Sequence, residues 1–247
     1  MTGVIHELFQ SGQPVAAGAG AHACRAGVMA LVLRPPAGAT AVATAAALLA
    51  DHKATLAALY QLTGTSAAQF DALYRPLVER LAEWVQRLPS LIEPKQTLLS
   101  ERLFSAERAL SRRRGVFLPP GAEPERIAYE ADVWTYAVFS IALLRALGPT
   151  LARWQVTLYV TQQQWRWLPW QASMQEAGAQ YYHVKRRNLA NERDTTPLIA
   201  HHMVPALAQN WLWDNPTVWT TWTQALSTSQ PPGVLAPLLD ALPTQSA

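Results

Sequence analysis

The sequence predicts a mainly α-helical domain with a small antiparallel β insertion, and three observations predict this class. Apolar residues recur at helical spacing in long segments from about residue 51 onward. Between residues 154 and 187 the segments become short, aromatic and β-branched, which is typical of strands. Half of the 247 residues are apolar and 15% are charged, so the chain can build a globular core.

Changes in composition divide the chain into three parts. Residues 1–50 form a Gly- and Ala-rich N-terminal arm that we expect to be partly ordered, with a short strand in GVMALVLRPP. Residues 51–228 carry the helical periodicity and form the domain. Residues 229–247 read as a C-terminal tail with one short apolar segment that docks on the domain.

Three helices are expected in the first half of the domain. The first spans 66–88, because Ser66 and Gln69 make a capping box before a run of periodic apolar residues. Pro76 either kinks this helix or marks its start. The second spans about 97–113. Its apolar face consists of Leu99, Leu103, Ala106 and Leu110, and its charged residues lie elsewhere, namely Glu101, Arg102, Glu107 and Arg108.

The third helix is expected to form the centre of the core. Pro124 suits its first position, and its second half is mostly apolar. We expect it to break at Gly148 and Pro149. Helices resume after the β segment, with Thr196 and then Asn215 as caps, each followed by a proline at the first helical position.

Composition also narrows the class of function. Cys24 is the single cysteine, so an internal disulfide is excluded, and no Cys/His spacing indicates a zinc site. The net charge of +3 and the pI near 9.2 permit binding to a polyanion without requiring it. No apolar run predicts a membrane span, and the first residues lack the pattern of a signal peptide, so we expect a cytoplasmic protein.

A family resemblance follows from the order of several segments over about residues 51–226. They are FDALYRPLVERLAEWVQRLP, RRRGVFLPPGAEPERIAYEADVWTYAVFSIALL, VTLYV, RWLPW and HHMVP. This order resembles the N-terminal domain of the MobH-class relaxases, the TraI-like HD-domain proteins of integrating conjugative elements. The resemblance implies an HD-type helical bundle with a small β insertion, and a role in processing DNA for conjugative transfer.

The resemblance also implies a metal site, whose ligands are replaced in this sequence. Family members carry histidines after the LP dipeptide, a further histidine in the next helix, and a His-Asp pair at the end of the long helix. Here the LP is followed by SLIEPKQTLLSE, the next helix has Glu101, and the pair is replaced by Arg145 and Ala146. A fixed cation repels a metal ion, so we expect no metal, no cofactor and no catalytic residue. Arg145 could instead bridge to Glu101.

Basic and aromatic residues suggest a different activity, binding to the DNA backbone. The candidate DNA-binding residues are Arg112, Arg113, Arg114, Arg166, Lys185, Arg186 and Arg187. Trp165, Trp167 and Trp170 could stack bases, or could simply anchor the ribbon to the helices. The basic runs could equally be solvated surface.

We therefore expect a catalytically degenerate relative of a conjugative relaxase, acting as a DNA-binding or relaxosome accessory protein. One alternative is a residual metal-dependent phosphohydrolase or nickase that uses His183, His201, His202, Glu101 or Asp132. Another is a pure protein scaffold, docking a relaxosome component or a second copy of the chain. The residues expected for the scaffold are Trp211, Trp213, Trp219 and Trp222.

Overall fold

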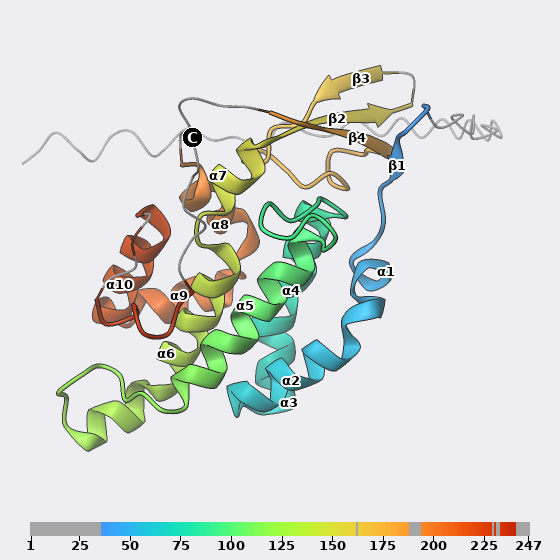
Figure 1. The fold of residues 1–247 in the computed structure, drawn as a ribbon. Helices are drawn as coiled ribbons and strands as arrows, with labels where there is room; N and C mark the ends of the chain where they lie inside the picture. The colour runs from blue at the N-terminus through green and yellow to red at the C-terminus, as the bar shows by residue number, and fades with distance from the viewer. Residues whose placement is uncertain (1–35, 162, 188–193, 229, 231–232, 241–247) are drawn as a thin grey trace, which may run out of the picture. The chain divides into compact units, whose positions relative to one another are not determined.

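A computed structural model describes residues 36–161, 163–187, 194–228, 230 and 233–240. All of them belong to one unit, Leu33–Ala247. This part of the chain is mainly helical with a small antiparallel sheet, so the predicted fold class is confirmed (Figure 1). The strand expected in GVMALVLRPP lies almost entirely outside the described residues.

Two long helices, α5 (Leu98–Arg113) and α6 (Pro124–Leu144), pack side by side at the centre of the domain (Figure 1). Pro124 starts α6, as the sequence predicts. From Tyr136 to Leu144 every residue of α6 is buried, because neighbouring elements cover it on all sides. The stretch Pro124–Ala152 is long and apolar enough to cross a membrane, but 72% of its most apolar window is buried inside the protein, as in the core helix of a globular domain.

The helix expected over 66–88 is present, with a local change of geometry before Pro76. It consists of α3 (Ala67–Gln69), a π-helical turn η2 (Phe70–Tyr74) and α4 (Arg75–Val85). Ser66 Oγ accepts a hydrogen bond from the Gln69 N–H at 3.2 Å, which confirms the predicted cap. Pro76 lacks an N–H and crowds the preceding turn, and the wider π turn accommodates it.

An N-terminal set of short helices packs beside α4 and α5. It comprises α1 (Ala45–Leu49), the 3₁₀ turn η1 (Ala50–His52) and α2 (Lys53–Thr63). Leu48 and Leu49 are buried, and so are Leu235 and Leu238 near the C-terminal end. The core therefore takes up residues on both sides of 51–228.

The central helix ends earlier than the sequence predicts. The chain leaves helical geometry at Arg145, and Ala146 adopts the left-handed conformation with φ 54° and ψ 24°. The predicted break at Gly148 and Pro149 is wrong, because both residues lie inside a new short helix, α7 (Leu147–Ala152). Pro149 is tolerated there since the first turn of a helix needs no N–H donor from it.

At Gly148 the helices α7 and α8 (Thr196–Met203) approach each other closely. A Cβ at Gly148 would lie 2.5 Å from the Thr196 nitrogen, so no other residue fits without a backbone shift. The Gly148 N–H donates to Thr196 Oγ1 at 2.9 Å. The prediction that Thr196 caps its own helix is therefore wrong, because its side chain binds the neighbouring helix instead.

The sheet lies at the end of α7 and has the strand order β1-β4-β2-β3, all antiparallel within the described residues (Figure 1). The strands are β1 (Thr40–Ala41), β2 (Trp154–Val160), β3 (Gln163–Arg166) and β4 (Tyr181–Arg186). Val156, Leu158 and Tyr182 face the core and are at most 1% exposed. The β insertion predicted for 154–187 is thus confirmed, and β1 extends it from the N-terminal side.

Two further helices, α9 (Ala206–Trp213) and α10 (Pro216–Ser227), complete the bundle. The predicted start of α10 at Pro216 is confirmed, and Asn215 occupies the predicted N-cap position. Its side-chain amide makes no capping hydrogen bond and donates back to the Trp211 carbonyl instead. Trp222 is buried and donates its indole N–H to Ser140 Oγ at 2.9 Å, which joins α10 to α6.

Gln86 ties the N-terminal segment to the end of α4, and this contact predicts a stability effect. Its side chain accepts from the Ala43 N–H at 2.8 Å and donates to the Ala43 carbonyl at 3.0 Å. Gln86→Ala leaves this backbone without partners, so we expect a loss of about 2 kcal/mol in the free energy of unfolding, measured by urea denaturation. Gln61→Ala, an exposed change of the same type, should cost less than about 0.5 kcal/mol. Equal effects of the two changes would contradict this role of Gln86.

Candidate functional site

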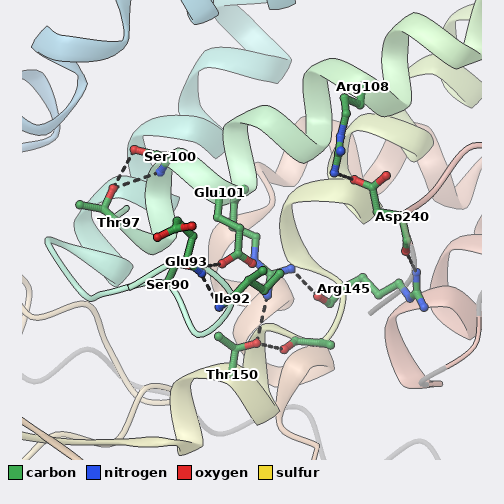
Figure 2. A network of polar contacts seen from close by, with 12 residues as sticks. Ser90, Ile92, Glu93, Thr97, Ser100, Glu101, Arg108, Arg145, Thr150 and Asp240 are labelled. Carbon is green, nitrogen blue, oxygen red and sulfur yellow. Dashed lines mark hydrogen bonds and ion pairs between the residues drawn. The ribbon is translucent and has the colours of Figure 1, made fainter. Parts of the chain in front are cut away.

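The three segments in which the family resemblance implies metal ligands meet at one place. They are the loop after Leu88-Pro89, the first turn of α5, and the end of α6. Figure 2 shows Ser90, Glu101 and Arg145, one from each segment, in a single network of polar contacts. The segments therefore converge as a ligand set would, although the side chains differ.

Ser90 and Glu101 form one side of this network. Ser90 Oγ donates to Glu101 Oε2 and accepts from the backbone N–H groups of Ile92 and Glu93, each at 3.0 Å (Figure 2). An isolated β-bridge between Pro89 and Thr97 closes the loop and brings Ser90 beside α5. Thr97 Oγ1 caps α5 by accepting from the Ser100 N–H. Glu101 is thus held by the loop, with its side chain 17% exposed.

The guanidinium of Arg102 lies between Glu101 and the end of α6. Its Nη1 donates to the Arg145 carbonyl at 2.7 Å, its Nη2 donates to Thr150 Oγ1 at 3.0 Å, and its Nε lies 3.9 Å from Glu101 Oε1. The last carbonyls of a helix carry negative partial charge and lack intrahelical partners, so they favour a cation here. A protein cation therefore occupies the space to which the three segments converge.

Burial makes this cation costly to hold. Desolvation lowers the pKa of Arg102, the carboxylate of Glu101 raises it, and the nearby Arg145 lowers it. Desolvation also lowers the pKa of Arg145. An arginine side chain still remains charged near neutral pH, since its ordinary pKa lies far above that range. The hydrogen bonds to Arg145 and Thr150 offset part of the desolvation cost.

The expected bridge between Arg145 and Glu101 is replaced by two separate contacts. Arg102, not Arg145, lies beside Glu101. The Arg145 side chain points away from Glu101 and donates to the Asp240 carbonyl at 3.2 Å (Figure 2). The expectation that Arg102 lies off the apolar face of its helix is also wrong, because this residue is 6% exposed.

Asp240 joins the C-terminal segment to the same region. Its carboxylate accepts from Arg108 and, at 2.9 Å, from Arg112, while its carbonyl accepts from Arg145. The contact between Arg108 and Asp240 is visible in Figure 2. The buried Leu235 and Leu238 precede Asp240, so apolar packing and ion pairs together fix this segment.

The residues present do not fit a divalent metal. Within the described residues, no three His, Cys, Asp or Glu side chains are grouped closely enough to bind one. Glu101 supplies the carboxylate where the three segments meet, and the guanidinium of Arg102 lies next to it. A metal at this place would meet that fixed positive charge, whose Coulomb repulsion offsets the attraction that one carboxylate supplies.

The three arginines at the end of α5, which the sequence suggests for DNA binding, donate hydrogen bonds to acceptors within the protein. Arg112 binds Asp240, Arg113 donates to the Val116 carbonyl at 2.5 Å, and Arg114 donates to the Gln61 carbonyl at 2.8 Å. These arginines therefore stabilise the end of α5 and the loop that follows it, as cations at a helix C-terminus do.

The other predicted basic residues lie on or beside the sheet. Arg166 ends β3, Lys185 and Arg186 end β4, and these three side chains are exposed. Arg187 follows directly, and its backbone N–H donates to the Arg153 carbonyl. The structure thus gathers this second group at the sheet and separates it in sequence and contacts from the arginine run of α5.

The histidines named for a residual metal site belong to different elements. His183 is on β4, whereas His201 and His202 are exposed residues of α8. His202 stacks on Trp84 with ring centroids 6.2 Å apart.

The tryptophans named in the sequence analysis differ in their exposure. Trp167 and Trp222 are buried, Trp211 and Trp219 pack against the core, and Trp165, Trp170 and Trp213 are exposed.

Comparison with known proteins gives one family match. A sequence model of the TraI_2 family, whose description reads "Putative helicase", matches residues 38–246. The match takes in the whole helical core, the sheet and the C-terminal segment that carries Asp240. No curated protein matches the chain.

The buried contacts of Arg102 predict that its removal lowers the stability of the domain strongly. Arg102→Ala removes the donors to the Arg145 carbonyl and Thr150 and leaves Glu101 beside an empty space. We expect the free energy of unfolding to fall by about 3 kcal/mol, measured by urea denaturation. Arg75→Ala breaks an exposed ion pair with Asp71 and should cost less than about 1 kcal/mol. If Arg102→Ala were no more harmful than Arg75→Ala, the guanidinium would not hold these segments together.

Proposed function

The chain belongs to the TraI_2 family of conjugation-related, TraI-like proteins, and from this premise we propose that it is a catalytically degenerate relative of the MobH-class relaxases. In this proposal residues 51–228 are a degenerate HD-like domain. The protein acts in mobile-element DNA transfer as a DNA-binding accessory of the relaxosome. It contacts the DNA backbone and carries no catalytic residue of its own.

One observation supports the proposed loss of catalysis. Ser90, Glu101 and Arg145 come from the three segments in which the family resemblance implies metal ligands, and they meet around the buried guanidinium of Arg102. Metal-dependent hydrolysis needs a divalent ion that activates water and neutralises phosphate charge. A guanidinium can neutralise charge, but it has no coordination site and cannot activate water.

The basic residues beside the sheet support contact with DNA. Arg166, Lys185 and Arg186 are exposed, whereas Arg112, Arg113 and Arg114 bind acceptors within the protein. Phosphates attract such a group without reading the base sequence, and the affinity then depends on salt. We therefore assign the backbone contacts to the sheet group.

Two assays on the purified full chain test the proposal. Supercoiled plasmid with Mg²⁺ or Mn²⁺ should stay intact, while labelled DNA should bind and lose affinity steeply between about 50 and 200 mM salt. Lys185→Ala should weaken binding and reduce the salt slope by about one, and Lys95→Ala, the same change on an exposed loop, should leave both unchanged.

Two results would overturn the proposal. Metal-dependent nicking that Glu101→Gln abolishes, and that Glu125→Gln on the exposed start of α6 preserves, would identify a residual nickase. Absence of DNA binding even at low salt would remove the DNA-binding role and favour a protein scaffold.

A further inference from the structure

The sheet presents one face to the core and one face to solvent, and the strand register assigns each residue to a face. Residues directly opposite each other in an antiparallel sheet have their side chains on the same side. Val156, Leu158 and Tyr182 form the buried side. The opposite side, here called the outer sheet face, carries Thr157, Tyr159, Arg166, Tyr181, His183 and Lys185.

These residues form rows across the strands. Tyr159 is directly opposite Tyr181, so their Cβ atoms lie about 5 Å apart. The next row runs from His183 across Thr157 to Arg166, and Lys185 begins the row after it. The tyrosines and His183 are partly exposed, and Arg166 and Lys185 are exposed. The row that carries Arg166 therefore lies directly beside the aromatic row, and the row that carries Lys185 lies one step further along the strands.

The charged residues on the strands of this region are basic. Glu176 is the one acidic residue of segment 154–187, and it lies in the loop between β3 and β4. Its carboxylate accepts a hydrogen bond from the Ser173 N–H at 2.8 Å, so it belongs to the structure of that loop. The outer sheet face thus combines partly exposed aromatic rings with positive charge and no carboxylate among its strand residues.

We propose that the outer sheet face binds single-stranded DNA, with bases stacked on Tyr159 and Tyr181 and phosphates held by Arg166 and Lys185. An unpaired strand offers both a base face and a phosphate, and stacking on aromatic side chains is independent of sequence. A duplex hides its base faces within the helix, so the tyrosine row would gain nothing from it. This inference rests on the proposed function and deepens it by naming the form of DNA.

The tyrosines take the role that sequence patterns suggest for tryptophans. Trp167 is buried and donates its indole N–H to the Ala172 carbonyl at 2.8 Å. Trp165 is opposite Leu158, which places it on the other side of the sheet. Neither ring belongs to the outer sheet face.

The test compares variants of the full chain by fluorescence anisotropy, with a labelled strand of about 16 nucleotides and its duplex. Tyr159→Leu with Tyr181→Leu keeps apolar side chains but removes the rings, and should weaken single-strand binding at least about tenfold. Phenylalanine at both positions should restore binding to within about twofold of the wild type. Tyr129→Leu is the matched control, because Tyr129 is 85% exposed on α6, away from the sheet.

The outcomes separate this inference from the proposed function. Selective loss of single-strand binding in the leucine variant, with rescue by phenylalanine and unchanged unfolding by urea, would support the outer sheet face. If the wild type binds DNA and Lys185→Ala weakens it, but the leucine variant binds as tightly as the wild type, the stacking inference fails and the DNA-binding role stands. Equal or tighter binding of the duplex would also overturn the inference. If the protein binds neither single-stranded nor duplex DNA, both the stacking inference and the DNA-binding role are overturned.

Discussion

The arrangement of the domain depends on a buried guanidinium that joins the end of α6 to α7. The carbonyl of Arg145 ends α6, and Thr150 lies in α7; Arg102 of α5 donates to both. Because α7 leads directly into β2, these hydrogen bonds fix the direction in which the chain leaves the helical core and enters the sheet. Ala146, in the left-handed conformation, makes the turn between α6 and α7. Gly148 has no side chain and so leaves room for the close approach of α8. The side chain of Arg102 thus fixes how the chain passes from the helical core into the sheet.

Local signals predicted much of the fold. The Ser66 cap, the start of α6 at Pro124 and the aromatic strands near 154–187 each depend on neighbouring residues, and all are present. Long-range contacts were not predictable in this way. β1 is two residues long and pairs with β4 across most of the chain, and Thr196 binds Gly148 rather than its own helix.

Part of the site could have been found from the helical period. Arg102 lies three residues after Leu99 and four before Ala106, so the spacing itself places it in the buried stripe of α5. Because a charged side chain is usually exposed, we expected Arg102 to lie off the apolar face. The acceptors that make burial possible, the Arg145 carbonyl and Thr150, are more than 40 residues away, where sequence periodicity carries no information. Likewise, the register of the strands, not their composition, determines which aromatic residues face solvent.

The contact between Asp240 and α5 also affects how the domain folds. Asp240 pairs with Arg108 across 132 residues, and Arg145 reaches the carbonyl of the same residue. During synthesis α5 and α6 emerge long before this segment, so their guanidinium groups remain hydrated until it arrives. A high contact order slows the search for such a closure. The helical pair can therefore assemble early on the ribosome, whereas the region around Arg145 is completed only after Asp240 has emerged and packs against it.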